Sequence, residues 1–133
     1  MITHRTRNES NLAPVKVRIP CGLLTLEGVL AVPKGAAGIV VFAHGSGSSR
    51  HSPRNKFVAL VIRESGYGTL LFDLLSAEEE IEDDITWNLR FDIALLASRL
   101  AVVTQWLDAQ TVFLAAEAAA AFRVRYFVIH PGP

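Results

Sequence analysis

The chain has 133 residues, of which half are hydrophobic and a fifth are charged, and this composition is typical of one globular domain. Thirteen basic residues balance thirteen acidic ones, so no overall charge favours nucleic acid or an anionic membrane as a partner. The single cysteine, Cys21, excludes a disulfide within the chain and favours a reducing, cytoplasmic location. We therefore expect no nucleic-acid partner and no membrane association.

The N-terminal region divides into a tail and a hairpin. Residues 1–13 are polar and lack the apolar core of a secretory signal, so we interpret them as a flexible arm before a single domain of residues 14–133. Residues 15–19 alternate apolar and charged side chains, as half-buried strands do. A second such segment, residues 24–32, follows a Pro-Cys-Gly break. Together they predict an antiparallel hairpin.

A strand, a helix and a strand are predicted next. Residues 39–43 are continuously apolar, which is typical of a central strand covered by helices on both faces. Ser52 and Pro53 predict a helix start, because a hydroxyl can cap free N–H groups and proline suits the first turn. Gly66 can end this helix, and residues 68–73 predict another buried strand. Such a unit predicts a parallel, right-handed crossover.

The second half of the chain is less regular. Residues 78–84 hold six carboxylates, which repel one another and predict a solvated loop or frayed helix rather than a metal site. Apolar residues every three or four positions predict a long amphipathic helix over residues 86–109. Residues 111–114 predict a short strand and residues 124–129 a last one, on either side of an alanine-rich tract. The four histidines are too scattered to suggest a ligand pair, so we expect no metal and no cofactor.

The end of the central strand carries the strongest motif. Phe-Ala-His-Gly at residues 42–45 is followed by a Gly/Ser-rich loop and by Ser-Pro-Arg-Asn at residues 52–55, and Asp73 ends the next strand. These segments, with the hairpin, resemble the dienelactone-hydrolase-like branch of the α/β-hydrolase family over about residues 14–110. The resemblance implies an α/β fold: the N-terminal part of a three-layer α/β-hydrolase sandwich, with a mixed, mostly parallel sheet and an N-terminal antiparallel hairpin.

The resemblance also implies a chemistry. Members of the family hydrolyse small-molecule esters or lactones with a serine or cysteine nucleophile, an oxyanion hole and a His/Asp pair. Small residues let the backbone approach a carbonyl, so that an N–H of the loop can stabilise the oxyanion. The histidine at the strand end is expected to pack beneath the loop through hydrogen bonds. The oxyanion and substrate-binding candidates are His44, Gly45, Ser46, Gly47, Ser48 and Arg50.

The nucleophile of the family is missing from this sequence. No G-x-S-x-G elbow occurs, and alignment of the alanine tract with the helix after the family's elbow places the nucleophile near Ala115 and the last glycine near Glu117. No aspartate follows Asp108, and His130 is a candidate catalytic histidine by residue type alone. The sequence therefore predicts an incomplete, inactive hydrolase domain, truncated or frame-shifted. The alternatives are a phosphate- or carboxylate-binding module and a scaffold that self-associates through an exposed sheet edge.

Overall fold

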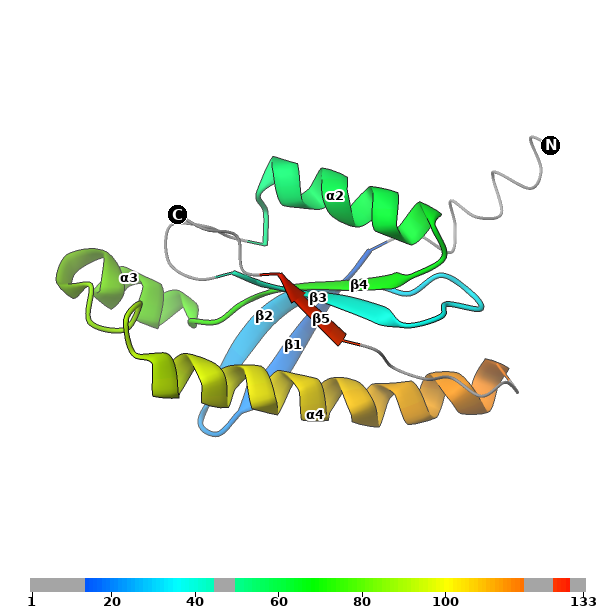
Figure 1. Cartoon of the computed structure of the whole chain (residues 1–133). Helices are drawn as coiled ribbons and strands as arrows, with labels where there is room; N and C mark the ends of the chain where they lie inside the picture. Colours follow the sequence, from blue (N-terminus) through cyan, green and yellow to red (C-terminus); the bar gives the residue numbers. More distant parts are fainter. Residues whose placement is uncertain (1–13, 45–49, 119–125, 130–133) are drawn as a thin grey trace.

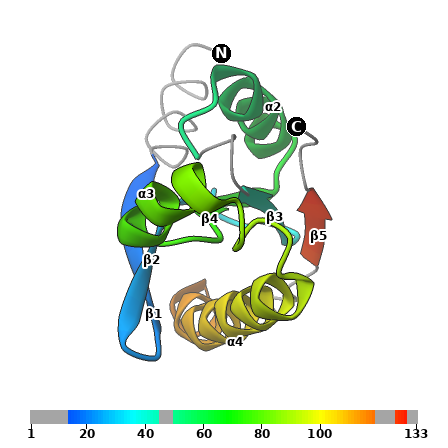
Figure 2. The same ribbon diagram turned by 90° about the vertical axis from the view of Figure 1, so that its left-hand side faces the viewer.

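The computed structural model describes residues 14–44, 50–118 and 126–129, which form a three-layer α/β sandwich (Figures 1 and 2). One mixed sheet of five strands has the order β1-β2-β4-β3-β5. The strands are β1 (Val15–Cys21), β2 (Leu24–Ala31), β3 (Ile39–His44), β4 (Gly68–Asp73) and β5 (Tyr126–Ile129). The helices are α2 (Pro53–Glu64), α3 (Ala77–Thr86) and α4 (Ile93–Ala118).

The predicted hairpin is present as β1 and β2, which pair antiparallel along the whole of β1. Gly22 makes the turn between them with a φ of +61°, a conformation that glycine adopts without steric cost. β1 continues two residues further than predicted, through Pro20 to Cys21. Proline is tolerated here because β1 is at the edge of the sheet.

The prediction of a central parallel strand is also confirmed. Every residue of β3 is buried, and the strand lies between β4 and β5, both parallel to it. Helix α2 covers one face of the sheet and α4 the other (Figure 2). On the α2 side, Phe42 and Leu71 pack with Ala59 of the helix. On the α4 side, Val41 and Phe72 belong to the same cluster as Val103 and Leu107 of that helix.

The start of α2 follows the residues that predicted it. Ser52 is the N-cap, and its hydroxyl oxygen accepts the backbone N–H of Asn55 at 3.5 Å, while Pro53 is the first helical residue. Gly66, with a φ of +95°, follows the last turn and directs the chain into β4. The crossover from β3 through α2 to β4 is therefore parallel, as expected.

The acidic segment, predicted as a solvated loop or a frayed helix, forms the regular helix α3. Its first turn contains a capping box, in which Glu79 N–H donates to Ser76 Oγ (3.2 Å) and Ser76 N–H donates to Glu79 Oε1 (2.9 Å). Three glutamates in this turn also interact favourably with the positive end of the helix dipole. Repulsion between carboxylates is thus outweighed, and Asp83 is fully buried.

The long helix begins and ends later than predicted. Trp87, in a left-handed conformation with a φ of 61°, ends α3, and α4 starts only at Ile93, so that residues 86–92 do not belong to it. The helix then continues to Ala118 through residues 111–114, whose prediction as a strand was wrong. The predicted last strand is present as β5, Tyr126–Ile129, and the first two residues of the prediction, 124 and 125, lie outside the described residues.

Candidate functional site

The candidate site lies where β3 and β4 end at the same edge of the sheet. His44 and Asp73 are register partners as the last residues of these parallel strands, and Leu74 N–H donates to the carbonyl of His44 at 2.9 Å. Ligands of open α/β sheets bind outside the carboxyl ends of the strands. The Gly/Ser-rich loop therefore starts from the edge at which chemistry is expected.

His44 is fully buried and hydrogen-bonded through both ring nitrogens. Nδ1 lies 3.2 Å from the carbonyl oxygen of Phe72, and because a carbonyl only accepts, this nitrogen carries the proton. Nε2 then accepts the side-chain amide of Asn55 at 3.0 Å. The ring thereby joins the end of β3 to β4 and to α2, which is a structural role and leaves neither nitrogen exposed for acid–base catalysis.

Arg50 fixes the other end of the loop. Its backbone N–H donates to Asp73 Oδ1 at 2.9 Å, and its guanidinium pairs with Asp73 Oδ2 and, at 2.7 Å, with Glu27 Oε2. The Arg50 side chain is only 19% exposed. These contacts join the loop to β4 and β2, so that Arg50 acts here as an anchor, and its contact with a substrate stays a prediction.

The remaining candidates, Gly45, Ser46, Gly47 and Ser48, lie outside the described residues. Their part in an oxyanion hole also stays a prediction, for which the described structure supplies the two ends of the loop. Asn55 and Glu27, the partners of His44 and Arg50, were not singled out from the sequence. Asn55 belongs to the Ser-Pro-Arg-Asn segment, which the sequence indicates only as a helix start and not as a source of a hydrogen bond to His44.

A small cavity of about 50 Å³ lies beside Arg50 and Asp73, lined also by Ser76 and Glu80. Its volume suits a water molecule rather than a substrate. Burial raises the pKa of the Glu80 carboxyl, and the negative charge of Asp73 adds to this effect. Acidic groups thus surround Arg50 on this side of the site.

Within residues 14–44, 50–118 and 126–129, no three His, Cys, Asp or Glu side chains gather as metal ligands would. Over the same ranges, no helix has the length and apolar character needed to cross a bilayer.

The solved structure of dienelactone hydrolase from Anabaena variabilis ATCC 29413 superimposes on 89% of this chain, with 48% sequence identity and a TM-score of 0.74. This chain has a dienelactone-hydrolase-like α/β-hydrolase fold. A second solved structure, Est1E from Butyrivibrio proteoclasticus, matches 86% of the chain with a TM-score of 0.60 and 14% identity, and so shows the fold alone. The chain spans 52% of the length of the dienelactone hydrolase and 39% of Est1E.

Sequence comparison adds two relatives and no family assignment. Two Mycobacterium tuberculosis proteins, from strains CDC 1551 / Oshkosh and ATCC 25618 / H37Rv and provisionally named phosphoribosyl transferases, are each 54% identical over 95 residues. The match covers 71% of this chain but only 20% of each relative. Most of each relative's length therefore lies outside the matched segment. No protein-family profile matches the chain.

The fold also corrects the expected position of the nucleophile. Ala115 and Glu117 lie within α4 rather than at a turn between a strand and a helix. The strand that follows the long helix is β5, which pairs parallel with β3. A hydrolase elbow lies between a strand and a helix, and α4 does not provide such a turn at Ala115. His130, the candidate catalytic histidine, lies outside the described residues.

Proposed function

We propose that this chain supplies the oxyanion-binding side of a hydrolase that cleaves ester or lactone bonds in small molecules. The observation that carries the proposal is the attachment of the Gly/Ser-rich loop to the carboxyl edge of the sheet, with His44 held at one end and Arg50 at the other. The 48% identity with a dienelactone hydrolase supports the same chemistry. A cytoplasmic location is part of the proposal.

The proposed chemistry depends on rigid positioning. In the transition state of ester hydrolysis, negative charge develops on the carbonyl oxygen, and backbone N–H groups of Gly45, Ser46 or Gly47 would donate to it. Loss of one such donor costs roughly 3 kcal/mol of transition-state stabilisation in hydrolases. The hydrogen bonds of His44 with Phe72 and Asn55 would keep the start of the loop in place before the substrate arrives.

We also propose that this chain does not hydrolyse esters by itself, because its sequence contains no G-x-S-x-G elbow. We infer that it corresponds to a truncated or frame-shifted part of a hydrolase, in line with the 52% of the dienelactone hydrolase that it spans. The nucleotide sequence beyond the codon for Gln110, read in all three frames, tests this inference. An elbow motif in another frame would support it.

Activity can be measured directly with 4-nitrophenyl acetate and dihydrocoumarin. We expect no turnover above background from the purified chain, and turnover after it is mixed with a C-terminal portion of the Anabaena variabilis dienelactone hydrolase that carries the nucleophile. Replacement of Asn55 by alanine should reduce the restored rate, because the start of the loop loses its support. Turnover by the chain alone that disappears on replacement of Cys21 would overturn the proposal.

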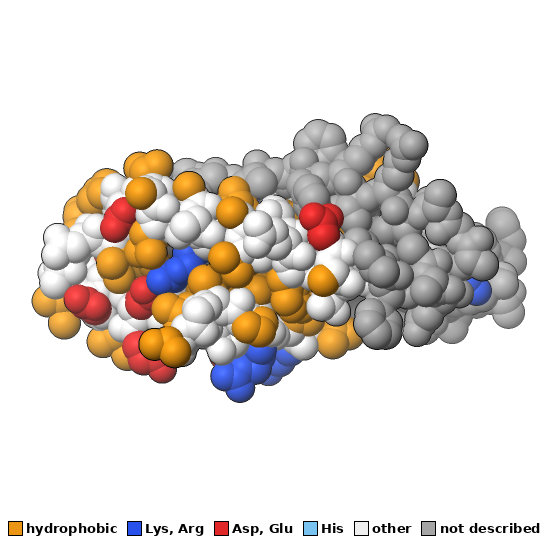
Figure 3. All heavy atoms as spheres, turned by 90° about the horizontal axis from the view of Figure 1, so that it is seen from below, with side chains coloured by type: hydrophobic (Ala, Val, Ile, Leu, Met, Phe, Trp, Pro, Cys, Tyr) orange, Lys and Arg blue, Asp and Glu red, His pale blue; other side chains and the backbone are white. Residues whose placement is uncertain are grey.

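A scaffold that associates with another copy of itself is the second candidate. Helix α2 exposes apolar side chains, among them Phe57 (67%) and Val61 (47%), and β5 is the last strand of the described sheet. Figure 3 shows further hydrophobic side chains over the described part of the α4 face, interspersed with acidic and basic ones. Sedimentation velocity at several protein concentrations distinguishes this candidate, which requires a concentration-dependent dimer.

A further inference from the structure

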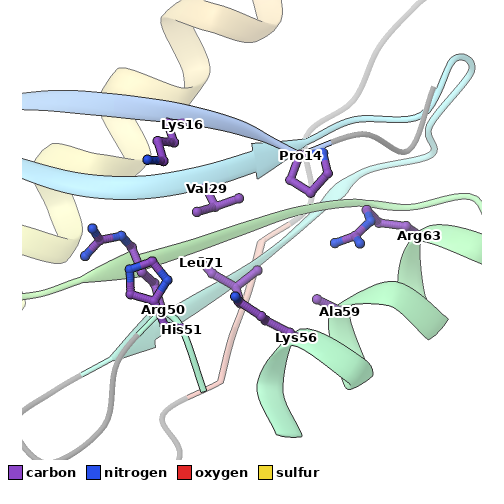
Figure 4. A pocket seen from close by; sticks show the side chains of 9 residues that line it. All are labelled: Pro14, Lys16, Val29, Arg50, His51, Lys56, Ala59, Arg63 and Leu71. Carbon is purple, nitrogen blue, oxygen red and sulfur yellow. The ribbon is translucent and has the colours of Figure 1, made fainter. Parts of the chain in front are cut away.

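A larger pocket, of about 320 Å³, lies on the α2 face of the sheet (Figure 4). Lys16, Val29 and Leu71 form a row across β1, β2 and β4, because each is the register partner of the next. Lys56 and Arg63 of α2 line the opposite side with Ala59, at a spacing that places all three on one face of the helix. Sheet and helix thus enclose the pocket together.

The pocket exists because α2 does not cover the whole sheet. The helix packs through Ala59 on Leu71 and Phe42, in β4 and β3. The neighbouring strands β2 and β1 extend beyond it, and β1 presents Lys16 instead of an apolar side chain at this row. The result is an apolar floor with a basic rim. The lining residues contain no acid: they are Pro14, Lys16, Val29, Arg50, His51, Lys56, Ala59, Arg63 and Leu71.

The positive charges of this rim are only partly balanced. Arg50 is paired with Asp73 and Glu27 and contributes little net charge. Lys16, Lys56 and Arg63, in contrast, form no ion pair with any residue that the structure describes. Among the described residues, Glu64 is the acidic group that acts on the charge of Arg63, from the neighbouring position of the helix, and it does not reach ion-pair distance. Three cations thus surround one pocket.

Arg63 has the least satisfied of these charges. Its Nη1 donates to the hydroxyl of Thr69 at 3.2 Å, whereas its Nε is buried without a hydrogen-bond partner among the described residues. Burial lowers the pKa of this guanidinium, against the opposing effect of Glu64, but an arginine stays charged at neutral pH. A half-buried cation with one neutral acceptor is costly, and an anion in the pocket would remove part of that cost.

We propose that this pocket binds a small organic phosphate monoester, with the phosphate between Lys16, Lys56 and Arg63 and the apolar part of the ligand on Val29 and Leu71. A phosphate monoester carries nearly two negative charges and several acceptor oxygens, which match three separate cations better than one carboxylate does. The volume is also at the lower end of the range for small-molecule sites. The pocket shares Arg50 with the candidate site, but the proposed binding does not depend on hydrolysis.

Isothermal titration calorimetry of the whole chain with phenyl phosphate tests the proposal. We expect a dissociation constant below about 1 mM, weaker binding of inorganic phosphate and of benzoate, and no binding of benzyl alcohol. Equal affinity for inorganic phosphate would overturn the role of the apolar floor, and equal affinity for benzoate would overturn the preference for phosphate. Undetectable binding of phenyl phosphate would overturn the site itself.

Substitutions of single residues test whether phenyl phosphate binds in this pocket. Lys56→Gln and Arg63→Gln should each weaken phenyl phosphate binding by about tenfold. Lys34→Gln is the matched control, because it removes the same charge as Lys56→Gln from an exposed turn that does not line the pocket, and it should change the affinity less than twofold. Circular dichroism checks that each variant is folded, and Lys56 is exposed, so its replacement leaves the core intact. An equal loss in the Lys34 variant would assign the binding to net charge and overturn the proposal.

Discussion

The guanidinium of Arg99, in α4, donates two hydrogen bonds of 2.7 Å to the two carboxylate oxygens of Glu79, in α3. The same guanidinium donates to the carbonyl of Leu74 at 3.0 Å. The side chains of Arg99 and Glu79 are only 7% and 19% exposed, so water competes little for either charge. This ion pair holds both helices to the segment that leaves β4, next to the candidate site.

Replacement of Arg99 by methionine should lower the free energy of unfolding by about 3 kcal/mol, because Glu79 would keep a shielded charge without its partner. Urea denaturation followed by circular dichroism measures this loss. Arg54→Met, at an exposed position of α2, is the control and should stay within about 0.5 kcal/mol of the wild type. Similar losses for the two variants would contradict the importance of the ion pair.

Glu79 should also make the stability depend on pH. The hydrogen bonds from Arg99 lower the pKa of its carboxyl in the folded chain below the ordinary value of 4.5, against the opposing effect of burial. As the pH falls, the unfolded chain therefore binds this proton first. The stability that Glu79 contributes is complete above the ordinary pKa and is lost as the pH falls from there through the lower pKa of the folded chain. Between neutral and acidic pH, the free energy of unfolding should fall less for Glu79→Gln than for the wild type, as measured by denaturation at each pH. Parallel curves would contradict this.

Asp83 and Asp84 are neighbours in the sequence, but we expect their replacement to change the stability of the chain very differently. Asp83 is fully buried and accepts the N–H groups of Leu89 (2.9 Å) and Arg90 (3.0 Å) and, at 2.9 Å, Arg90 Nε. The Asp84 side chain is 70% exposed and lies 3.9 Å from Arg90. Asp83→Ala should therefore cost about 3 kcal/mol and Asp84→Ala less than about 0.5 kcal/mol in thermal or urea unfolding. A comparable cost for both variants would show that the turn after α3 does not depend on Asp83.

Asn55 can be tested through His44. Asn55→Ala should destabilise the chain by about 1–3 kcal/mol, because the buried ring loses the amide that donates to Nε2. Asn55→Asp should recover part of this stability, since a carboxylate can accept a hydrogen bond from protonated Nε2 and thereby favours the charged ring, which raises its pKa. Two-dimensional NMR of the His44 ring nitrogens during a pH titration measures that rise. An unchanged His44 titration in the aspartate variant would contradict the assigned contact.

The stability of the whole chain is a further prediction. We expect oligomers or a low, broad unfolding transition, because α2 exposes Phe57 and Val61 and the edge of β5 has no further strand among the described residues. Sedimentation and chemical denaturation provide the measurement. A strictly monomeric chain with a cooperative transition above about 8 kcal/mol would contradict the interpretation as an incomplete domain.

The elements that the sequence predicts correctly depend on local signals. Alternation and a glycine turn suffice for the hairpin, and a wholly apolar run suffices for β3. Ser52 and Pro53 determine the start of α2 through contacts within one helical turn. In the candidate site, the same local pattern placed His44 at the end of β3.

The errors concern residues whose partners are distant in the sequence or whose pattern is ambiguous. The acidic segment forms a helix because Glu79 pairs with Arg99 and Asp83 with Arg90, and neither pairing follows from charge counts. Residues 111–114 are a short apolar run, which periodicity cannot assign to a strand or a helix. The hydrogen bond of Asn55 with His44 depends on how α2 lies on the sheet, and so required the structure.

The pairing of β5 with β3 has a consequence for folding kinetics. These neighbours in the sheet are separated in the chain by α2, β4, α3 and α4, so their contact closes a long loop before any hydrogen bond between them forms. The β1–β2 hairpin, joined by a short turn, closes at little entropic cost. We therefore expect β5 to join last, during synthesis as well as in refolding. Until then β3, the most apolar strand, has one open edge, and this intermediate is the species most prone to aggregate.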